Sequence, residues 1–217
     1  MSDECQAIHE MARALPRFEF PFDEKEIPSN GIYILFEKGE TGHGGDRIVR
    51  IGTHTGKSQL RSRLKQHFLN ENKDRSIFRK NIGRAMLNRD HDSFLGSWEL
   101  DLTTRAARAA NASIDSERQK SIEKQVSDCI RNRFSFCVFE VNDKDARLEI
   151  ESKLISTISW CTSCQPSADW LGNHSPKMKI AESGLWLVNE LYKKPFDAEG
   201  IEGLSSLLSY RNAEVSS

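Results

Sequence analysis

The feature that most constrains the fold is a pair of short apolar runs separated by a glycine-rich segment. Residues 32–36 read Ile-Tyr-Ile-Leu-Phe, and residues 48–51 read Ile-Val-Arg-Ile. Both runs have the length of a strand and are rich in β-branched or aromatic side chains, which favours β-structure. The glycines at 39, 42, 44 and 45 predict a flexible loop between them. We therefore expect an antiparallel hairpin with a wide turn.

Helices are expected on both sides of this hairpin. Residues 3–14 predict a short helix, after which prolines at 16, 21 and 28 keep the chain irregular up to residue 30. Ser58 is expected to cap a helix that runs to about residue 69. In that helix Arg63 and His67 are four residues apart, so they share a face and can meet one ligand.

A second amphipathic helix is expected over residues 76–88. Its apolar side chains would point inward: Ile77, Phe78, Ile82, Met86 and Leu87. Its basic side chains would be left for solvent or phosphate: Arg75, Arg79 and Arg84. Residues 101–133 contain no glycine or proline and are rich in helix-forming residues, which predicts a helical arm.

A third strand is expected over residues 134–141, and it should be central because it is apolar on both sides. Asp143 or Asp145 can cap the next helix, whose apolar residues repeat at helical spacing up to Ile158. Together these elements predict an α+β fold: a small three-stranded antiparallel sheet flanked by helices, with a helical insertion and extensions.

The length of 217 residues suits one small domain with substantial additions. We expect an N-terminal extension at 1–29, a domain at 30–176 with a helical insertion at about 71–133, and a C-terminal extension at 177–217. The composition, 37% apolar and 29% charged, is typical of soluble globular proteins. Because no run is apolar enough to span a bilayer and the first residues are acidic, the sequence predicts no membrane partner and a cytoplasmic location.

The net charge is only −1, but the cations are unevenly distributed. Between Lys57 and Arg89 lie ten basic residues against two acidic ones, Glu71 and Asp74. A polyanion would be attracted to this segment if its cations share a face. On charge alone, a solvated helix surface explains the pattern equally well.

The five cysteines favour reduced thiols over a disulfide framework, because their number is odd and no export signal precedes them. Cys161 and Cys164 have the spacing of metal ligands. A tetrahedral zinc site needs two further ligands, and no second C-x-x-C or H-x-x-x-H occurs in the sequence. We therefore favour small thiols packed beside Trp160, with a zinc site as the alternative.

Four short motifs fall on the expected elements in a recognisable order. Gly31-Ile32-Tyr33 opens the first strand, Ile51-Gly52 ends the second, Arg63 to His67 lies on the following helix, and Glu151-Ser-Lys-Leu-Ile155 lies on the helix after the third strand. This ordered set resembles the GIY-YIG nuclease superfamily over about residues 30–175, and Asn173 is similar to an asparagine that follows in many members. Each motif alone is weak evidence, but together they are much stronger.

The resemblance implies a Mg²⁺-dependent (or Mn²⁺-dependent) DNA endonuclease that uses one metal ion, in a repair, restriction or mobile-element context. Tyr33 would take a proton from the attacking water, which requires nearby cations because its ordinary pKa is about 10. Arg63 would hold phosphate oxygens and stabilise the transition state. His67 would hydrogen-bond the phosphate or the tyrosine. Glu151, rather than the nearby Glu149, would bind the metal.

The sequence departs from the family at Arg50, where the second motif normally has a tyrosine. Arginine stays protonated and cannot replace a base. Either Tyr33 acts alone or His54 or Lys57 assists it, while Arg50 contacts phosphate or marks a member without activity. Arg75, Arg79 and Asn173 complete the expected substrate-binding residues.

Two other interpretations stay open. A catalytically inactive nucleic-acid-binding module of the same fold is supported by Arg50. A metal-stabilised protein-interaction domain would be built around Cys161 and Cys164.

Overall fold

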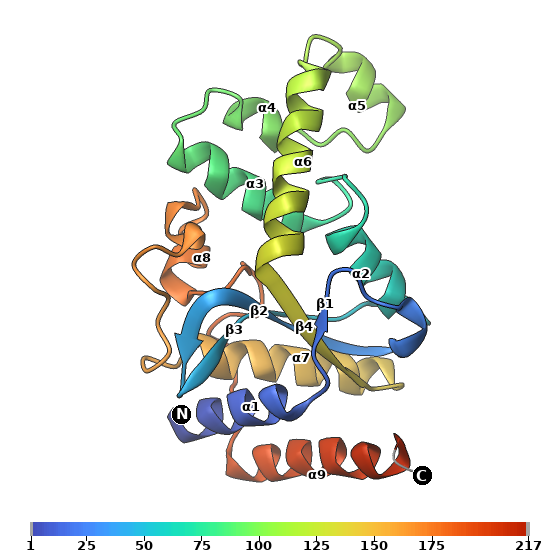
Figure 1. The fold of residues 1–217 in the computed structure, drawn as a ribbon, viewed down its shortest axis with the longest axis vertical. Helices are drawn as coiled ribbons and strands as arrows, with labels where there is room; N and C mark the ends of the chain where they lie inside the picture. The colour runs from blue at the N-terminus through green and yellow to red at the C-terminus, as the bar shows by residue number, and fades with distance from the viewer. Residues whose placement is uncertain (1, 216–217) are drawn as a thin grey trace.

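The computed structural model describes residues 2–215, with side chains described up to residue 208. The described residues form one antiparallel sheet of four strands in the order β1–β4–β2–β3 (Figure 1). Strands β2 (Gly31–Gly42), β3 (Gly45–Gly52) and β4 (Phe134–Glu140) confirm the three expected strands and the α+β class. The expectation of three strands is corrected by β1 (Phe18–Glu19), which pairs with β4. Two residues among prolines are too few to leave a periodic signal.

The turn of the β2–β3 hairpin is tight rather than wide. Gly42 pairs with Gly45, so only His43 and Gly44 connect the strands. Both have positive φ, 51° and 75°, as the turn that matches the twist of paired strands requires. The glycine-rich segment therefore continues β2, and Gly39, at φ 93°, lies within an irregular part of the ladder instead of in an open loop.

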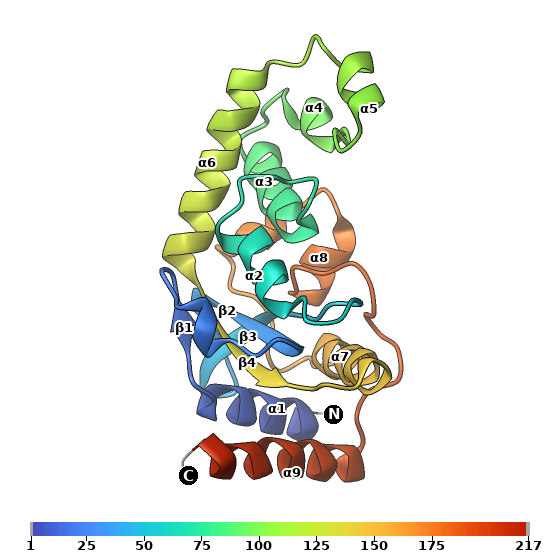
Figure 2. The same cartoon turned by 90° about the vertical axis from the view of Figure 1, so that its right-hand side faces the viewer.

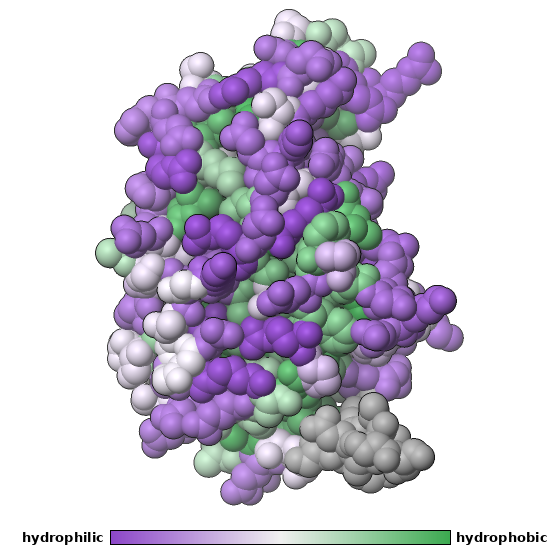
Figure 3. Space-filling model, in the orientation of Figure 1, coloured by the Kyte–Doolittle hydropathy of each residue, from purple (hydrophilic) through white to green (hydrophobic). Residues whose placement is uncertain are grey.

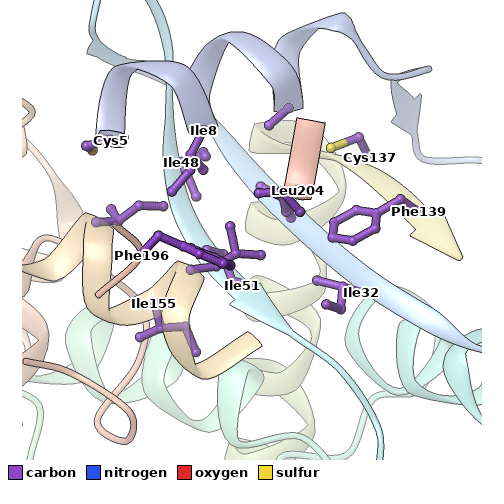
Figure 4. Close-up of a cluster of buried hydrophobic side chains, with 14 of the residues drawn as sticks. Cys5, Ile8, Ile32, Ile48, Ile51, Cys137, Phe139, Ile155, Phe196 and Leu204 are labelled. Atoms are coloured by element: carbon purple, nitrogen blue, oxygen red, sulfur yellow. The ribbon is translucent and has the colours of Figure 1, made fainter. Parts of the chain in front are cut away.

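Side chains of β2 alternate between two hydrophobic clusters, one on each face of the sheet. Ile32, Ile34 and Phe36 belong to one cluster. On that face lie α1 (Ser2–Ala14), α7 (Lys144–Ser159) and α9 (Ala198–Val215). Figure 4 shows residues of α1 and α7, including Ile8 and Ile155, around those of the strands. Asp143 caps α7 by accepting the N–H of Ala146 at 2.8 Å, as expected.

Tyr33 and Leu35 point to the opposite face, where the second cluster lies. There α2 (Leu60–Phe68), α3 (Ile77–Arg89) and α6 (Ser116–Arg133) cover the sheet. Figure 2 places these helices above the sheet, with α1 and α9 below it. Ser76 caps α3 by accepting the N–H of Arg79. The expected cap at Ser58 is wrong, because α2 starts one residue later with Gln59 at its N-cap and Ser58 itself has φ 57°.

The arm expected over 101–133 consists of α5 (Arg105–Ala110) and the longer α6, which leads directly into β4 (Figure 1). The short helix α4 (Leu95–Glu99) precedes it. Trp98 of α4 is fully buried against Gly83 of α3, where an added Cβ would lie 2.4 Å from the indole ring. The remaining short elements are η1 (Glu24–Glu26), η2 (Leu171–His174) and α8 (Met178–Ser183).

The expected division of α3 into an apolar and a basic face is wrong. Arg79 is fully buried and Arg84 is 7% exposed, whereas the apolar Ile77 is 42% exposed. Each buried arginine has an anionic partner: Arg79 binds Glu123 of α6 at 2.8 Å, and Arg84 binds Glu99 of α4 at 2.6 Å. Because α4 and α6 cover its basic side, α3 is an internal helix, and its charges bind α4 and α6 instead of facing solvent.

The face of the molecule seen in Figure 1 is largely polar. Figure 3 shows hydrophilic residues over most of the face seen in Figure 1, with hydrophobic residues visible between them. Among the described residues, the helices are too short or too polar to span a membrane.

Candidate active site

A pocket of about 330 Å³ opens beyond the end of β3, where α2 and α7 approach each other. It is lined mainly by polar side chains from the loop after β3 and from these two helices. The lining residues are Thr53, His54, Thr55, Gln59, Ser62, Arg63, Gln66, Leu148 and Glu151. The pocket thus combines one carboxylate and one guanidinium from helices that follow different strands.

Glu151 extends from α7 to the end of β3. One of its carboxylate oxygens accepts the backbone N–H of Thr53 at 2.9 Å. Burial raises the pKa of Glu151, while the charge of Arg50 and the N–H of Thr53 oppose that rise. Burial therefore disfavours the charged form of the carboxylate, and a cation bound beside it would stabilise that form. Glu149, the competing candidate, is exposed and pairs with Lys153 at 2.7 Å.

Arg63 lines the opposite side of the pocket from α2. It is partly buried, and its guanidinium donates to the side-chain oxygen of Gln66 at 3.3 Å. Its charge lowers the pKa of both His67 and Glu151, so the guanidinium lies close enough to act on both. A guanidinium has five N–H donors, and one bond to Gln66 leaves it able to bind an anion in the pocket.

Tyr33 and His67 form a hydrogen-bonded pair behind the pocket. The tyrosine hydroxyl lies 2.9 Å from Nε2 of His67, and Nδ1 of His67 lies 2.8 Å from the hydroxyl of Ser76. Both side chains of the pair are fully buried. Burial, together with the charges of Arg50, Arg63 and Arg79, lowers the pKa of His67 well below its ordinary value, so the ring is neutral. A neutral imidazole has one nitrogen that accepts a hydrogen bond, so either Nε2 accepts from Tyr33 or Nδ1 accepts from Ser76.

The ring of Tyr33 lies across Gly52 of the neighbouring strand. The two residues are partners in the β2–β3 ladder, and a Cβ added at Gly52 would lie 2.2 Å from the tyrosine hydroxyl. Only glycine therefore admits the ring at this position. Thr53, which follows directly, lines the pocket. The glycine of the second motif thus places the tyrosine of the first motif next to the pocket wall.

Arg50 is buried at 4% exposure and faces Tyr33 instead of the pocket. Its Nε donates a long hydrogen bond of 3.4 Å to the tyrosine hydroxyl, and another of its nitrogens donates to the backbone carbonyl of Trp186. Its guanidinium lies 5.2 Å from the ring centre of Phe78. The arginine that replaces the second-motif tyrosine therefore supplies a fixed positive charge beside the remaining tyrosine.

His54 and Lys57, in the loop after β3, were expected to assist Tyr33 as the proton acceptor. His54 lines the pocket, but both ring nitrogens contact the backbone: Nδ1 lies 2.6 Å from the carbonyl of Gly56, and Nε2 accepts the N–H of Gly31 at 3.4 Å. Burial lowers its pKa. Lys57 is exposed and lines a neighbouring hollow that shares Thr55 with the pocket.

Besides Arg50 and Lys57, three further expected substrate-binding residues do not line the pocket. Arg75 is exposed just before α3, and Arg79 is fully buried in its ion pair with Glu123. Asn173 is exposed on η2, where its amide donates to the carbonyls of Ser167 and Ala168 at 3.0 Å. The structure therefore groups Tyr33, Arg63, His67 and Glu151 and leaves these three apart.

Sequence reasoning missed the uncharged polar residues of the site. Ser76 was expected only as the start of a helix, yet its hydroxyl also contacts His67. Gln59, Ser62 and Gln66 line the pocket from α2 and the residue before it. Since Ser62 and Gln66 are four residues apart and flank Arg63, their helical spacing was the available signal.

The neutral state of His67 makes the stability of the protein depend on pH. A pKa below the ordinary value of 6.5 means that the unfolded chain binds a proton that the folded protein does not. We therefore expect the free energy of unfolding to fall as the pH drops below about 6.5, by at most about 1.4 kcal/mol per pH unit for this group. Denaturant titrations at several pH values measure this.

His67→Gln should flatten the pH profile between pH 7.5 and 5, because the amide can still bond Tyr33 but does not titrate. His174→Gln, at an exposed position, serves as the control and should keep the wild-type profile. An unchanged slope in His67→Gln would contradict the assignment.

Comparison with known protein families places this fold and site in one class. The family model described as "GIY-YIG domain" matches residues 6–213. The chain therefore belongs to the GIY-YIG domain family, as the motifs predicted, and this domain implies a nuclease-like function acting on nucleic acid. Searches of curated proteins and of solved structures gave no match.

Proposed function

We propose that this protein is a Mg²⁺-dependent DNA endonuclease that hydrolyses phosphodiester bonds with one metal ion. The observation that carries the proposal is the pocket in which Arg63 and Glu151 face each other, with the Tyr33–His67 pair directly behind it. A negatively charged phosphate can pair with the guanidinium of Arg63, and a hydrated cation can bind the carboxylate of Glu151.

The donor set fits Mg²⁺ rather than a softer ion. Mg²⁺ prefers oxygen ligands, keeps several waters and is commonly held by one or two carboxylates plus phosphate oxygens. The pocket supplies one carboxylate, Glu151, among hydroxyl and amide side chains, and it has room for water. When bound there, the ion would neutralise negative charge on the leaving 3′-oxygen.

The protein's own groups have separate tasks in this proposal. Arg63 binds the scissile phosphate and stabilises the charge that develops on it. Tyr33 accepts the proton of the attacking water and can pass its own proton to Nε2 of His67, 2.9 Å away. Arg50 helps to hold the tyrosine hydroxyl in place, because its Nε donates to that oxygen at 3.4 Å. Since Tyr33 is fully buried, side chains of the pocket must shift when DNA binds.

The test is cleavage of plasmid, linear and branched DNA with Mg²⁺, with Mn²⁺ and with EDTA. We expect nicks that require the metal ion and that produce mappable ends. Arg63→Ala should lose about 10²–10³-fold in cleavage rate, the usual cost of removing one group that stabilises transition-state charge. Tight DNA binding without cleavage of any substrate in either metal would refute the proposal.

DNA should extend from the pocket over the neighbouring hollow. That hollow is lined by Lys57, Lys144 and Arg147 together with Asn30, Thr55, Gly56 and Asn142, and both lysines are exposed. Each phosphate contact contributes about 0.9 to the slope of log affinity against log salt. We expect the double variant Lys57→Ala/Lys144→Ala to bind DNA more weakly and to reduce that slope by about 2.

Lys38→Ala is the matched control for this measurement. Lys38 is exposed on β2, five residues and therefore roughly 17 Å from Tyr33 along the strand. Its loss should leave the salt dependence of binding unchanged. Equal slopes for the double variant and the wild type would exclude the hollow from the DNA-binding surface.

Two observations favour a second candidate function, a nucleic-acid-binding module that does not cleave. Tyr33 has no exposed surface, and the second motif has Arg50 where a tyrosine is expected. Such a module would bind DNA through the same cations. Its distinguishing result is DNA binding that persists in EDTA, with no metal-dependent product.

A further inference from the structure

Three segments that are far apart in the sequence meet on the face of the sheet covered by α1. Cys5 lies in the first turns of α1, His43 is in the β2–β3 turn, and Cys161 and Cys164 follow α7. Their potential ligand atoms all lie within 4.8 Å of one another. We call these four residues the cysteine–histidine cluster. The fold thus brings Cys5 and His43 to Cys161 and Cys164, and these are the two further ligands that the sequence motif lacks.

We propose that the cysteine–histidine cluster binds one structural zinc ion. Three cysteines and one histidine are a common ligand set of closed, tetrahedral zinc sites, in which every position is taken by the protein. This site is separate from the proposed active site, because Cys161 lies ten residues beyond Glu151. Eight of these residues continue α7, which ends at Ser159, and eight residues of helix correspond to roughly 12 Å.

Two distances within the cluster match the edges of a zinc tetrahedron. Zn–S bonds of about 2.3 Å and Zn–N bonds of about 2.0–2.1 Å place two sulfurs about 3.8 Å apart, and a sulfur and a nitrogen about 3.5 Å apart. The sulfurs of Cys5 and Cys164 are 3.6 Å apart, and the sulfur of Cys161 lies 3.4 Å from Nε2 of His43. The S···S distance is far too long for a disulfide bond.

The surroundings favour a fixed site. Cys5, Cys161 and Cys164 are buried at 0%, 4% and 6% exposure. A Cβ added at Gly42 would lie 2.8 Å from Cβ of Cys164, so the absence of a side chain at Gly42 leaves room for this cysteine. His43 has φ 51°, an uncommon conformation for a residue other than glycine, and the tight turn holds its ring toward Cys161.

Charge and the neighbouring side chains also fit an ion at this position. Three thiolates, a neutral imidazole and Zn²⁺ carry a net charge of −1. Arg13 of α1 lies beside the turn and donates to the carbonyls of Gly42 and His43 at 3.0 and 2.9 Å. The ring of His9 lies 5.0 Å from that of His43, centre to centre. A zinc ion would therefore join α1, the hairpin and the segment after α7.

The first test measures metal in wild-type protein purified under reducing conditions without chelator. Elemental analysis should find about one zinc ion per chain. Replacement by Co²⁺ should give the intense thiolate-to-cobalt absorption of a tetrahedral site. Removal of the metal should lower the melting temperature. Folded protein that contains only trace zinc and gives no such cobalt spectrum would overturn the proposal.

The second test uses variants that exchange a buried thiol for a hydroxyl. Cys164→Ser should reduce zinc to a small fraction of the wild-type content and remove the cobalt spectrum. Cys137→Ser is matched, because Cys137 is also fully buried in the cluster of apolar side chains under α1. It should keep the zinc. If Cys164→Ser does not fold, the cobalt spectrum of the wild type decides; full zinc in a folded Cys164→Ser protein overturns the site. Neither readout involves DNA, so the outcome is independent of the proposed nuclease activity.

Discussion

Replacing Glu151 by glutamine is expected to abolish metal-dependent cleavage while the metal-free protein becomes more stable. The variant loses the negative charge that attracts the cation, but its amide oxygen can still accept the N–H of Thr53. A metal ion that stabilises transition-state charge is worth several kcal/mol. We therefore expect cleavage to fall by about 10³-fold, measured under single-turnover conditions in Mg²⁺.

The gain in stability follows from the direction of the pKa shift. Burial raises the pKa of Glu151, so the folded protein binds its proton more tightly than the unfolded chain does. Stability is then lost as the pH rises through the window between the ordinary pKa and the raised one, and at pH 7.5 the ionised group opposes folding. Glu151→Gln removes that cost, and we expect about 0.5–2 kcal/mol of added stability in denaturant titrations with EDTA.

Glu149→Gln is the matched control on the same helix. Its carboxylate is exposed and pairs with Lys153, so its loss should change neither cleavage nor stability appreciably. Wild-type cleavage by Glu151→Gln, or a comparable loss in Glu149→Gln, would contradict the assignment of the metal ligand.

Replacing Tyr33 by phenylalanine is expected to remove most cleavage and leave DNA binding intact. The change deletes one hydroxyl, the proposed proton acceptor, and keeps the ring that packs on Gly52. Proton transfer by a positioned side chain contributes typically about 10²–10⁴-fold, so we expect a loss in that range. Because the hydroxyl bonds His67, stability should also fall by about 1 kcal/mol.

Two measurements separate catalysis from structure in this experiment. Fluorescence anisotropy with labelled DNA should give the wild-type affinity, and single-turnover rates should give the loss. Tyr192→Phe, at a 39% exposed tyrosine that packs against Trp160, should retain full activity. Lower stability with an unchanged rate would show that Tyr33 only supports the fold, and the base would then have to be sought elsewhere in the pocket.

Local patterns were sufficient to predict the main elements. The runs at 32–36, 48–51 and 134–141 pack apolar residues on both faces of the sheet. Each strand is therefore a nearly continuous apolar run, which is easy to recognise in the sequence. The short β1 leaves none, since its pairing with β4 depends on a partner more than a hundred residues away. The width of the hairpin turn was also missed, because glycines permit both an open loop and a tight turn.

The charged side chains of the pocket and the tyrosine–histidine pair behind it were predicted better than the uncharged residues of the pocket lining. Tyr33, Arg63, His67 and Glu151 were named from motif order, and the structure brings them together. The burial of Arg79 was not foreseeable, because its partner Glu123 lies 44 residues away on the helical arm. Positive charge along a helix does not show whether the helix faces solvent, DNA or another part of the chain.

The two charged walls of the pocket come from opposite faces of the sheet: Arg63 from the helix over one face, and Glu151 from the helix under the other. During synthesis Arg63 leaves the ribosome about ninety residues before Glu151. An unfinished chain that ends before α7 contains Arg63 but lacks the carboxylate of Glu151. In the proposed enzyme, an incomplete chain therefore cannot cut DNA until α7 has been synthesised and has packed on the sheet.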